Sequence, residues 1–263
     1  MDKADVLRGV RLFVLDLDGT VYLGEELIEG ADGFISALQE DETRDFVFFT
    51  NNASRVPSFY VEKLRRLGIF VEESRILTAG DVTAAYLRET YPGGRVLLNG
   101  TPILEENWRA KGIRLVEEAP DVCVQSFDTT LTYEKLERIC RYVRQGVPFL
   151  ATHMDTNCPT EDGYIPDCGA MCALITESTG VKPRYFGKPF AETVETIERI
   201  CNVRREDMAF VGDRLYTDVA TGVRNGAKGF LVLSGEADMD TVRSSDVAPT
   251  AIYASLAEMR EYL

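Results

Sequence analysis

Histidine and tryptophan are almost missing from this chain, and each occurs once among its 263 residues. With His153 as the lone histidine, a zinc site built from several histidines is excluded, and a catalytic triad nearly so. The first five residues lead into no signal-peptide core, and no apolar run approaches the ~20 residues of a membrane span. The 6 cysteines show no disulfide pattern. We therefore expect a cytoplasmic protein with reduced thiols and no membrane partner.

Positive charge is also scarce, because 29 Lys and Arg face 43 Asp and Glu, for a net charge of −14. Such a chain repels polyanions, so we expect neither nucleic acid nor an anionic membrane as a partner. Apolar residues at 45% and charged residues at 27% are ordinary for a soluble protein, and the length suits two domains. An anionic substrate would need a site with local positive charge.

Short apolar runs alternate with amphipathic stretches of helical length, which indicates an α/β fold with a mostly parallel sheet. Within the first 80 residues we expect strands at 11–17, 46–49 and 76–78, and helices at 31–39 and 57–67. After residue 182 we expect helices at 192–201 and 218–224, and strands at 208–211 and 229–233. The pattern predicts a Rossmann-like, doubly wound core.

A second α/β pattern interrupts the first. We expect strands at 95–98, 121–125 and 148–152, and helices at 102–111 and 133–145. A polar loop at 155–169 and a helix to about residue 179 follow. The sequence thus predicts a core of residues 1–80 plus 183–263 and an inserted smaller α/β cap domain at 81–182, which would select the substrate.

Four polar clusters lie where a sheet edge is expected. They are Asp16 with Asp18, Thr50 with Asn51, Lys188, and Asp213 with Asp218. In open parallel α/β sheets, ligands bind beyond the carboxyl ends of the strands, so these segments should converge. Acids and a lysine crowded together are costly unless a cation and an anion share the pocket. The clusters therefore predict a site for a metal ion and an anionic group.

Asp16 and Asp18 are two residues apart at a strand end, so both side chains can face the same way. One carboxylate can attack phosphorus, while the second protonates the leaving oxygen and then activates water. Gly19 allows the sharp turn that brings the backbone close to a bound phosphate. A plain Asp-Gly surface turn is the alternative interpretation.

The other clusters supply phosphate and metal ligands. Thr50 can give a hydroxyl and Asn51 its N–H and side chain to a phosphoryl group, although both would also suit a helix cap. Lys188 can balance the nucleophile and the phosphoryl charge. Asp213 and Asp218 offer the hard oxygen ligands that Mg²⁺ prefers, and the alternative is an N-cap with a first-turn acid.

The segments DLDGT (16–20), TNN (50–52), GKP (187–189) and GDRLYTD (212–218) resemble the haloacid dehalogenase-like superfamily of phosphatases. The position of the insert is similar to the NagD-like branch with its type IIA-like cap. That branch includes p-nitrophenylphosphatases, nucleotidases, phosphoglycolate phosphatase and pyridoxal phosphate phosphatase. An acid at position 18 matches the phosphatases of the superfamily rather than its dehalogenases.

The resemblance implies a role for each core residue. Asp16 would be the nucleophile and a Mg²⁺ ligand. Asp18 would be the acid and base and would give its backbone carbonyl to the metal. Phosphate would be held by Thr50, Asn51, Lys188 and Gly19, and the metal also by Asp213, with Asp218 ligating directly or as a support. The substrate would be a small phosphate monoester such as a nucleotide or sugar phosphate.

The cap departs from the pattern of the branch, which has Ala-Thr-Asn-x-Asp and Pro-Gly-x-Gly. Here these stretches are 151–155, with His153 and Asp155, and 166–169, with Asp167 and Cys168. These four residues are candidate substrate contacts, and His153 has the alternative of a structural loop residue. The resemblance also makes a homodimer through the cap an expectation.

Two other functions fit the same residues. A receiver-like signalling module also uses a strand-end Asp, nearby acids, Mg²⁺ and a Lys on a doubly wound sheet. A phosphotransferase or mutase could use the same scaffold. The inserted cap favours an enzyme that encloses a small substrate.

Overall fold

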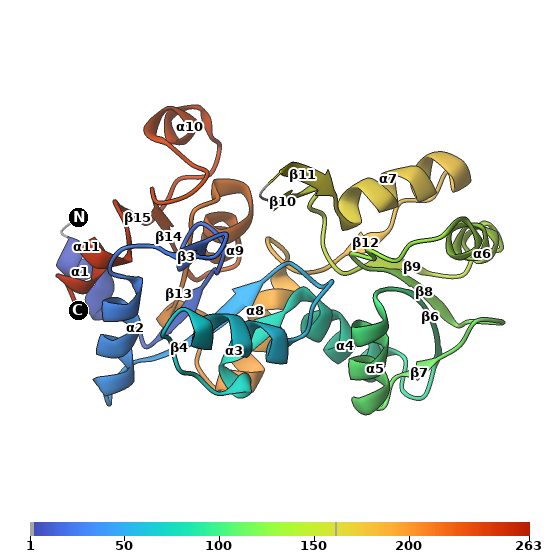
Figure 1. Cartoon of the computed structure of the whole chain (residues 1–263), viewed down its shortest axis with the longest axis horizontal. Coiled ribbons are helices and arrows are strands. Elements are labelled where there is room, and N and C mark those ends of the chain that lie inside the picture. The colour runs from blue at the N-terminus through green and yellow to red at the C-terminus, as the bar shows by residue number, and fades with distance from the viewer. Residues whose placement is uncertain (1–2, 161) are drawn as a thin grey trace. The chain divides into compact units, whose positions relative to one another are not determined.

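The chain forms two compact units in a computed structural model that describes residues 3–160 and 162–263 (Figure 1). The first unit comprises the segment up to Thr50, Ser58–Leu77 and Lys188–Leu263. The second comprises Asn51–Pro57 and Thr78–Gly187. The boundaries between the units thus lie within a few residues of the expected limits at 80 and 183. In addition, the short segment Asn51–Pro57 belongs to the second unit. Substrate selection by the second unit stays a prediction.

A six-stranded sheet in the order β15-β14-β13-β1-β4-β5 organises the first unit. Its strands are β1 (Leu12–Leu15), β4 (Asp45–Thr50), β5 (Ile76–Thr78), β13 (Met208–Gly212), β14 (Lys228–Val232) and β15 (Ala251–Tyr253). β1 pairs in parallel with both β4 and β13, so that Leu12 lies opposite Asp45 and Met208. The predicted α/β architecture is confirmed, and the carboxyl ends of β1 and β13 meet at the same edge.

Both faces of this sheet are covered, as the alternation of strand side chains requires. Phe13 and Leu15 join one apolar cluster with side chains of α1, α2, α3 and α11, while Leu231 joins a second cluster with Val219. The helices are α1 (Lys3–Arg8), α2 (Ala31–Glu40), α3 (Pro57–Arg66), α8 (Ala191–Cys201), α9 (Ala220–Arg224), α10 (Met239–Ser244) and α11 (Leu256–Arg260). Helices on both faces make the core doubly wound.

Shorter elements connect these layers. They are β2 (Tyr22–Leu23), β3 (Glu26–Leu27), the 3₁₀ turns Glu73–Arg75 and Arg205–Asp207, and a π-helical turn, Leu215–Val219. The helix expected at 218–224 therefore begins as the π-helical turn. The first and last helices lie side by side in Figure 1, where Lys3 forms an ion pair with Glu258.

The second unit has its own sheet, in the order β12-β9-β8-β6-β7, and its own apolar core. The strands are β6 (Arg95–Asn99), β7 (Arg114–Leu115), β8 (Val122–Gln125), β9 (Phe149–Ala151) and β12 (Arg184–Tyr185). The helices are α4 (Ala79–Thr90), α5 (Pro102–Ala110), α6 (Tyr133–Arg144) and α7 (Cys168–Thr179). Core side chains include Phe127, Ile139 and Ile175.

The polar loop expected at 155–169 was wrong in part, because it contains an antiparallel hairpin of β10 (Asn157–Thr160) and β11 (Gly163–Pro166). Most hairpin residues are exposed, so these strands show no alternation of buried and exposed side chains.

The sequence analysis also missed α4. The start of this helix is fixed by a reciprocal cap, in which Asp81 N–H donates to Thr78 Oγ1 and Thr78 N–H donates to Asp81 Oδ2.

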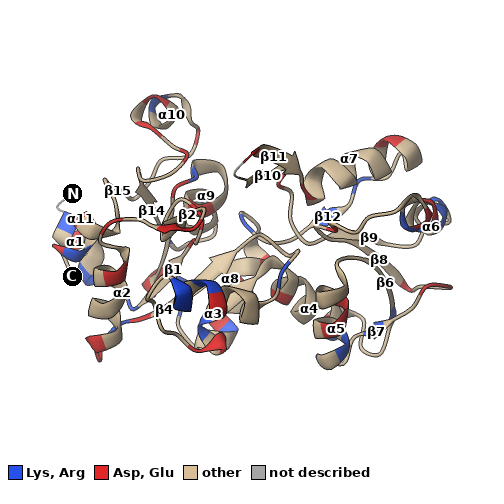
Figure 2. Cartoon of the chain, in the orientation of Figure 1, with Lys and Arg blue, Asp and Glu red and all other residues tan. Residues whose placement is uncertain are grey.

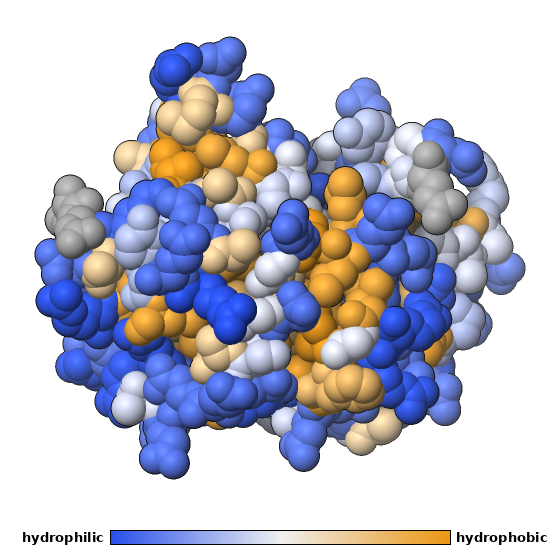
Figure 3. Space-filling view, turned by 60° about the vertical axis from the view of Figure 1, so that its left-hand side comes forward, coloured by the Kyte–Doolittle hydropathy of each residue, from blue (hydrophilic) through white to orange (hydrophobic). Residues whose placement is uncertain are grey.

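Figure 3 shows one face of the molecule, on which hydrophilic residues predominate at the rim and hydrophobic residues gather in a broad patch right of the centre and in smaller patches on the left. Within 3–160 and 162–263, no helix has both the length and the apolar character that a bilayer crossing needs.

The packing of α9 on β14 yields a stability test. A Cβ on Gly222 would lie 2.1 Å from the carbonyl oxygen of Lys228. Because that atom belongs to the backbone, we expect Gly222→Ala to lower the free energy of unfolding by about 2 kcal/mol or more. Urea unfolding of the whole chain measures this. Gly9→Ala is the control, because its Cβ would meet only Lys228 Nζ at 3.9 Å. Equal stability of the two variants would contradict the tight packing.

Candidate active site

Asp16 and Asp213 lie at one edge of the first unit's sheet because they follow β1 and β13, which are neighbouring strands. The N–H of Asp16 donates to the carbonyl of Val211 at 2.8 Å, which extends the β1–β13 ladder by one residue. Asp213 directly follows β13. The structure thus brings Asp16 and Asp213 together, as predicted from the parallel sheet.

Lys188 links two of the acids. Its ammonium donates to Oδ1 of Asp16 and to Oδ1 of Asp218, and it also reaches the carbonyl of Phe49 at 3.3 Å. The lysine side chain is only 5% exposed, so this charge is held away from water. Burial alone would lower the pKa of Lys188, but Asp16 and Asp218 outweigh it and raise that pKa. The lysine is therefore a fixed cation.

Asp16, Asp213 and Asp218 form a carboxylate cluster in which one oxygen of each lies within 4.8 Å of the others. Burial raises the pKa of Asp16 well above its ordinary value, against the opposing effect of Lys188, and the other two acids raise it further. Burial, followed by Asp218, raises the pKa of Asp213 to about 6. One lysine therefore does not balance the three acids.

This cluster fits a divalent cation. Asp213 Oδ1 is buried and has no hydrogen-bond partner within the described part of the chain, which is costly for a carboxylate oxygen. Hard oxygen ligands at this spacing suit Mg²⁺. Asp218 is more constrained, because Oδ1 accepts from Lys188 and Oδ2 accepts from the N–H of Arg214 at 3.2 Å.

Asp18 lies outside the carboxylate cluster. Its Oδ2 is 3.5 Å from the hydroxyl of Tyr22, whose ring lies under the ammonium of Lys63. Burial raises the pKa of Asp18, and Lys63 and Arg214 oppose that shift. Lys63 is one of the basic residues in the last turn of α3, drawn in blue in Figure 2. An acid whose pKa is raised, beside the cluster, suits proton transfer.

The backbone conformation and the close packing at position 19 both require a glycine. Its φ is 81°, and a Cβ there would lie 2.3 Å from Oδ2 of Asp213. A side chain at this position would displace Asp213. The expected phosphate-binding glycine thus also makes room for a candidate metal ligand.

A loop after β14 supports Asp213, and the sequence analysis missed it. The N–H of Glu236 donates to Asp213 Oδ2 at 2.7 Å, and Ser234 donates to the carbonyl of Gly19 at 2.8 Å. Glu236 also forms an ion pair with Arg214 at 2.8 Å. Of these residues, only Arg214 could have been suspected from the sequence, because it directly follows Asp213. The loop contacts depend on the return of a distant segment.

The first two residues of the TNN segment belong to different units. Thr50 ends β4 in the first unit and is 5% exposed. Asn51 belongs to the second unit, where its amide donates to Oδ2 of Asp155 at 3.1 Å. Asn51 is therefore connected to the loop that the sequence analysis assigned to the substrate.

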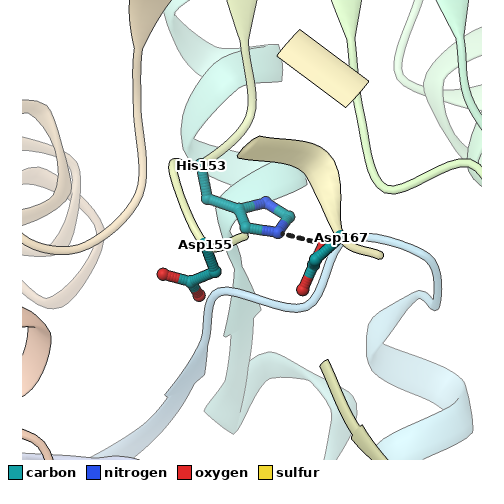
Figure 4. A group of neighbouring side chains, drawn as sticks. All are labelled: His153, Asp155 and Asp167. Atoms are coloured by element: carbon teal, nitrogen blue, oxygen red, sulfur yellow. Dashed lines mark hydrogen bonds and ion pairs between the residues drawn. The ribbon is translucent and has the colours of Figure 1, made fainter. Parts of the chain in front are cut away.

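The four cap candidates gather around the start of α7. Figure 4 shows the imidazole of His153 next to Asp167, and Nε2 lies 2.8 Å from Asp167 Oδ1. Burial would lower the pKa of His153, but Asp167 and Cys168 dominate and raise it to about 10. His153 is fully buried, so the structure favours the alternative of a structural loop residue.

Cys168 is buried beside this pair, and its thiol reaches the carbonyl of Gln125 at 3.4 Å. Burial would raise its pKa, but a hydrogen bond with Cys172 and the charge of His153 lower it to about 7. Cys158, Cys168 and Cys172 are thiols and are not joined in disulfides.

Comparison with known proteins gives a consistent result. Residues 13–114 match the family model described as haloacid dehalogenase-like hydrolase, and residues 185–259 match a second one for HAD-like hydrolases. An acid sugar phosphatase of Staphylococcus saprophyticus is 32% identical over 254 residues, which is 96% of this chain and 98% of that protein.

Solved structures agree with these matches. A 4-nitrophenylphosphatase of Thermotoga maritima is 41% identical with a TM-score of 0.93, covering 97% of this chain and 98% of its own. A glycerol phosphate phosphatase of Mycobacterium tuberculosis, solved with magnesium, is 30% identical with a TM-score of 0.88, covering 97% of this chain and 77% of its own. NagD proteins also match, as expected from the sequence.

The raised pKa of Asp213 predicts how stability without metal depends on pH. The folded-state pKa of about 6 exceeds the ordinary 3.8, so the folded state binds the proton more tightly. Stability from this group is therefore present below pH 4 and is lost as pH rises through 6, by at most about 3 kcal/mol. We expect Asp213→Asn to be more stable than the natural chain at pH 8 in chelator, and no more stable at pH 4. Urea midpoints test this, and identical pH profiles would contradict it.

Proposed function

Because the chain belongs to the haloacid dehalogenase-like hydrolases and is a phosphoric monoester hydrolase, we propose that it transfers the phosphoryl group of its substrate to Asp16. The observation that supports this is the contact of Lys188 with Asp16, beside the oxygens of Asp213 and Asp218. The proposed nucleophile thus has a cation at its side and two further carboxylates close to it.

We propose Mg²⁺ as the metal, held by Asp16, Asp213 and the backbone carbonyl of Asp18. When bound, the ion would neutralise phosphate charge and help to orient the phosphoryl group. The buried, unpartnered Oδ1 of Asp213 supports this assignment, as does the magnesium complex of the mycobacterial relative. Asp218 has both oxygens hydrogen-bonded, which favours a supporting role in which it orients Lys188.

In the first step, a carboxylate oxygen of Asp16 attacks phosphorus. The Asp16–phosphorus bond forms as the bond from phosphorus to the ester oxygen breaks, and Asp18 gives its proton to that leaving oxygen. Lys188, whose ammonium already contacts Asp16, stabilises the charge that develops on the phosphoryl oxygens.

In the second step, water cleaves the aspartyl-phosphate. Asp18, now ionised, takes a proton from water as the water oxygen attacks phosphorus, and the bond to Asp16 breaks. Inorganic phosphate leaves and both carboxyl groups return to their starting state. Thr50, Asn51 and Gly19 would hold the phosphate through hydroxyl and N–H donors.

The names of the relatives support a substrate class. Their names include acid sugar phosphatase, 4-nitrophenylphosphatase and glycerol phosphate phosphatase. We propose sugar phosphates and glycerol phosphate as the first candidates, followed by nucleotides. A cytoplasmic location and a dimer through the cap stay predictions from the sequence.

The two alternatives make different products. A receiver-like module would keep a long-lived aspartyl-phosphate and turn over no ester, whereas the relatives are phosphatases. A mutase would move phosphate to another carbon of the same sugar. Release of one phosphate per substrate consumed distinguishes hydrolysis from both.

Replacing the nucleophile tests covalent catalysis. We expect Asp16→Asn to lower kcat for p-nitrophenyl phosphate by at least ~10³-fold, because members of one catalytic unit fail together. Release of p-nitrophenol is measured with Mg²⁺, and circular dichroism checks the fold. Asp32→Asn is the control, since Asp32 is exposed on α2. A variant at position 16 that turns over normally would rule out the aspartyl-phosphate.

Removing a metal ligand tests the ion site. We expect Asp213→Asn to raise the Mg²⁺ concentration for half-maximal activity by at least ~10-fold, because a charged ligand oxygen is lost. Calorimetric titration of chelator-treated protein with Mg²⁺ should show the same weakening. Unchanged Mg²⁺ affinity would place the ion elsewhere.

A further inference from the structure

We propose that Asp155 is a positioning residue for phosphate binding and that it acts by orienting Asn51; this inference rests on the proposed function. The amide nitrogen of Asn51 donates to Asp155 Oδ2 at 3.1 Å, and both residues belong to the second unit. Asn51 directly follows Thr50, the other proposed phosphate ligand of this segment, so holding the Asn51 side chain restrains the segment that carries both residues.

The other side of this carboxamide is enclosed as well. A Cβ added to Gly187 would lie 2.7 Å from Asn51 Oδ1 and 3.0 Å from the carbonyl oxygen of Thr152. Gly187 has a φ of 70° and directly precedes Lys188. The carboxamide of Asn51, which is 7% exposed, is thus confined between Asp155 and the turn that leads to Lys188.

Asp155 is itself held by backbone contacts with the start of α7. The N–H of Gly169 donates to the carbonyl of Asp155 at 2.7 Å, and the N–H of Asp167 donates to that of Thr156 at 3.0 Å. A Cβ on Gly169 would lie 2.1 Å from the carbonyl oxygen of Met154. The loop carrying Asp155 therefore lies directly against the first turn of the helix.

A buried side-chain pair closes this arrangement. His153 Nε2 contacts Asp167 Oδ1 at 2.8 Å, and Nδ1 lies 3.0 Å from the hydroxyl of Thr152. Asp167 Oδ1 also accepts from the N–H of Cys168 at 2.5 Å, as the cap of α7. Because both ring nitrogens are engaged, His153 acts on the loop and not on the substrate. Figure 4 shows the pair with Asp155 beside it.

The same three side chains offer donor atoms within 4.8 Å of one another, a spacing that a metal could use. However, His153 and Asp167 already bond each other and Asp155 already bonds Asn51. The geometry therefore favours a hydrogen-bonded support for Asn51 over a second metal centre, and Zn²⁺ provides the test between them.

The experiment is a double-mutant cycle between positions 155 and 51, followed with p-nitrophenyl phosphate and with inorganic phosphate as a competitive inhibitor. We expect Asp155→Ala to raise KM and the inhibition constant of phosphate by about 10-fold, with kcat within about 3-fold, because a group that binds both states equally is misplaced. Combined with Asn51→Ala, it should add nothing, since the two act as one unit.

Further variants at His153 and Asp155 test how the Asn51 side chain is supported. His153→Gln should raise both constants by a smaller factor, and this effect should vanish in the Asn51→Ala background. Asp155→Asn should retain most of the binding, because its side-chain oxygen can still accept from Asn51. Glu177→Ala, on the exposed side of α7, is the control and should change nothing.

Three results would overturn the proposal: additive effects of Asp155→Ala and Asn51→Ala, a loss confined to kcat, or stoichiometric Zn²⁺ binding that His153→Gln removes. If Asp155→Ala does not fold, the same cycle is run with Asp155→Ser, whose short side chain also loses the contact with Asn51. Failure of the covalent mechanism is seen separately, as activity that survives in Asp16→Asn.

Discussion

The ammonium of Lys188, buried between Asp16 and Asp218, is the interaction on which the site depends. Without it, three carboxylates would face one another in a poorly solvated place, and they would protonate or separate. With it, the proposed nucleophile lies next to a cation that offsets part of the carboxylate charge. A chain with a net charge of −14 can thus receive an anionic ester, because the charge that matters is local.

Much of this site could be predicted from the sequence because parallel strands end at a common edge. The register of β1 with β13 fixes Asp16 beside Asp213, whatever the details of the side chains. The strands themselves were visible as continuous apolar runs, since helices cover both faces of the sheet. For Asp16, Asp18 and Asp213, topology alone therefore accounts for their place in the first unit. Lys188 instead follows β12, a strand of the second unit's sheet, so the shared edge of the first sheet does not explain its position.

Other features could not be predicted, because they arise from contacts between distant segments or from local chemistry without a pattern. Nothing in the sequence around Glu236 indicates that its N–H holds Asp213. The exposed β10–β11 hairpin lacks a buried face and was taken for a loop. His153 was a candidate substrate contact with the alternative of a structural loop residue, and only the fold shows that Asp167 pairs with it in the interior.

The division of the chain into units falls between Thr50 and Asn51 and again between Gly187 and Lys188. Each of the two segments that we propose to bind phosphate therefore has residues in both units, joined by a single peptide bond. A change in the loop around Asp155 reaches Asn51 through one hydrogen bond, and Thr50 through the chain itself. Substitutions in this loop can consequently alter phosphate affinity without touching the nucleophile, the lysine or the carboxylate cluster, which is the kind of separation that lets one catalytic core serve different esters.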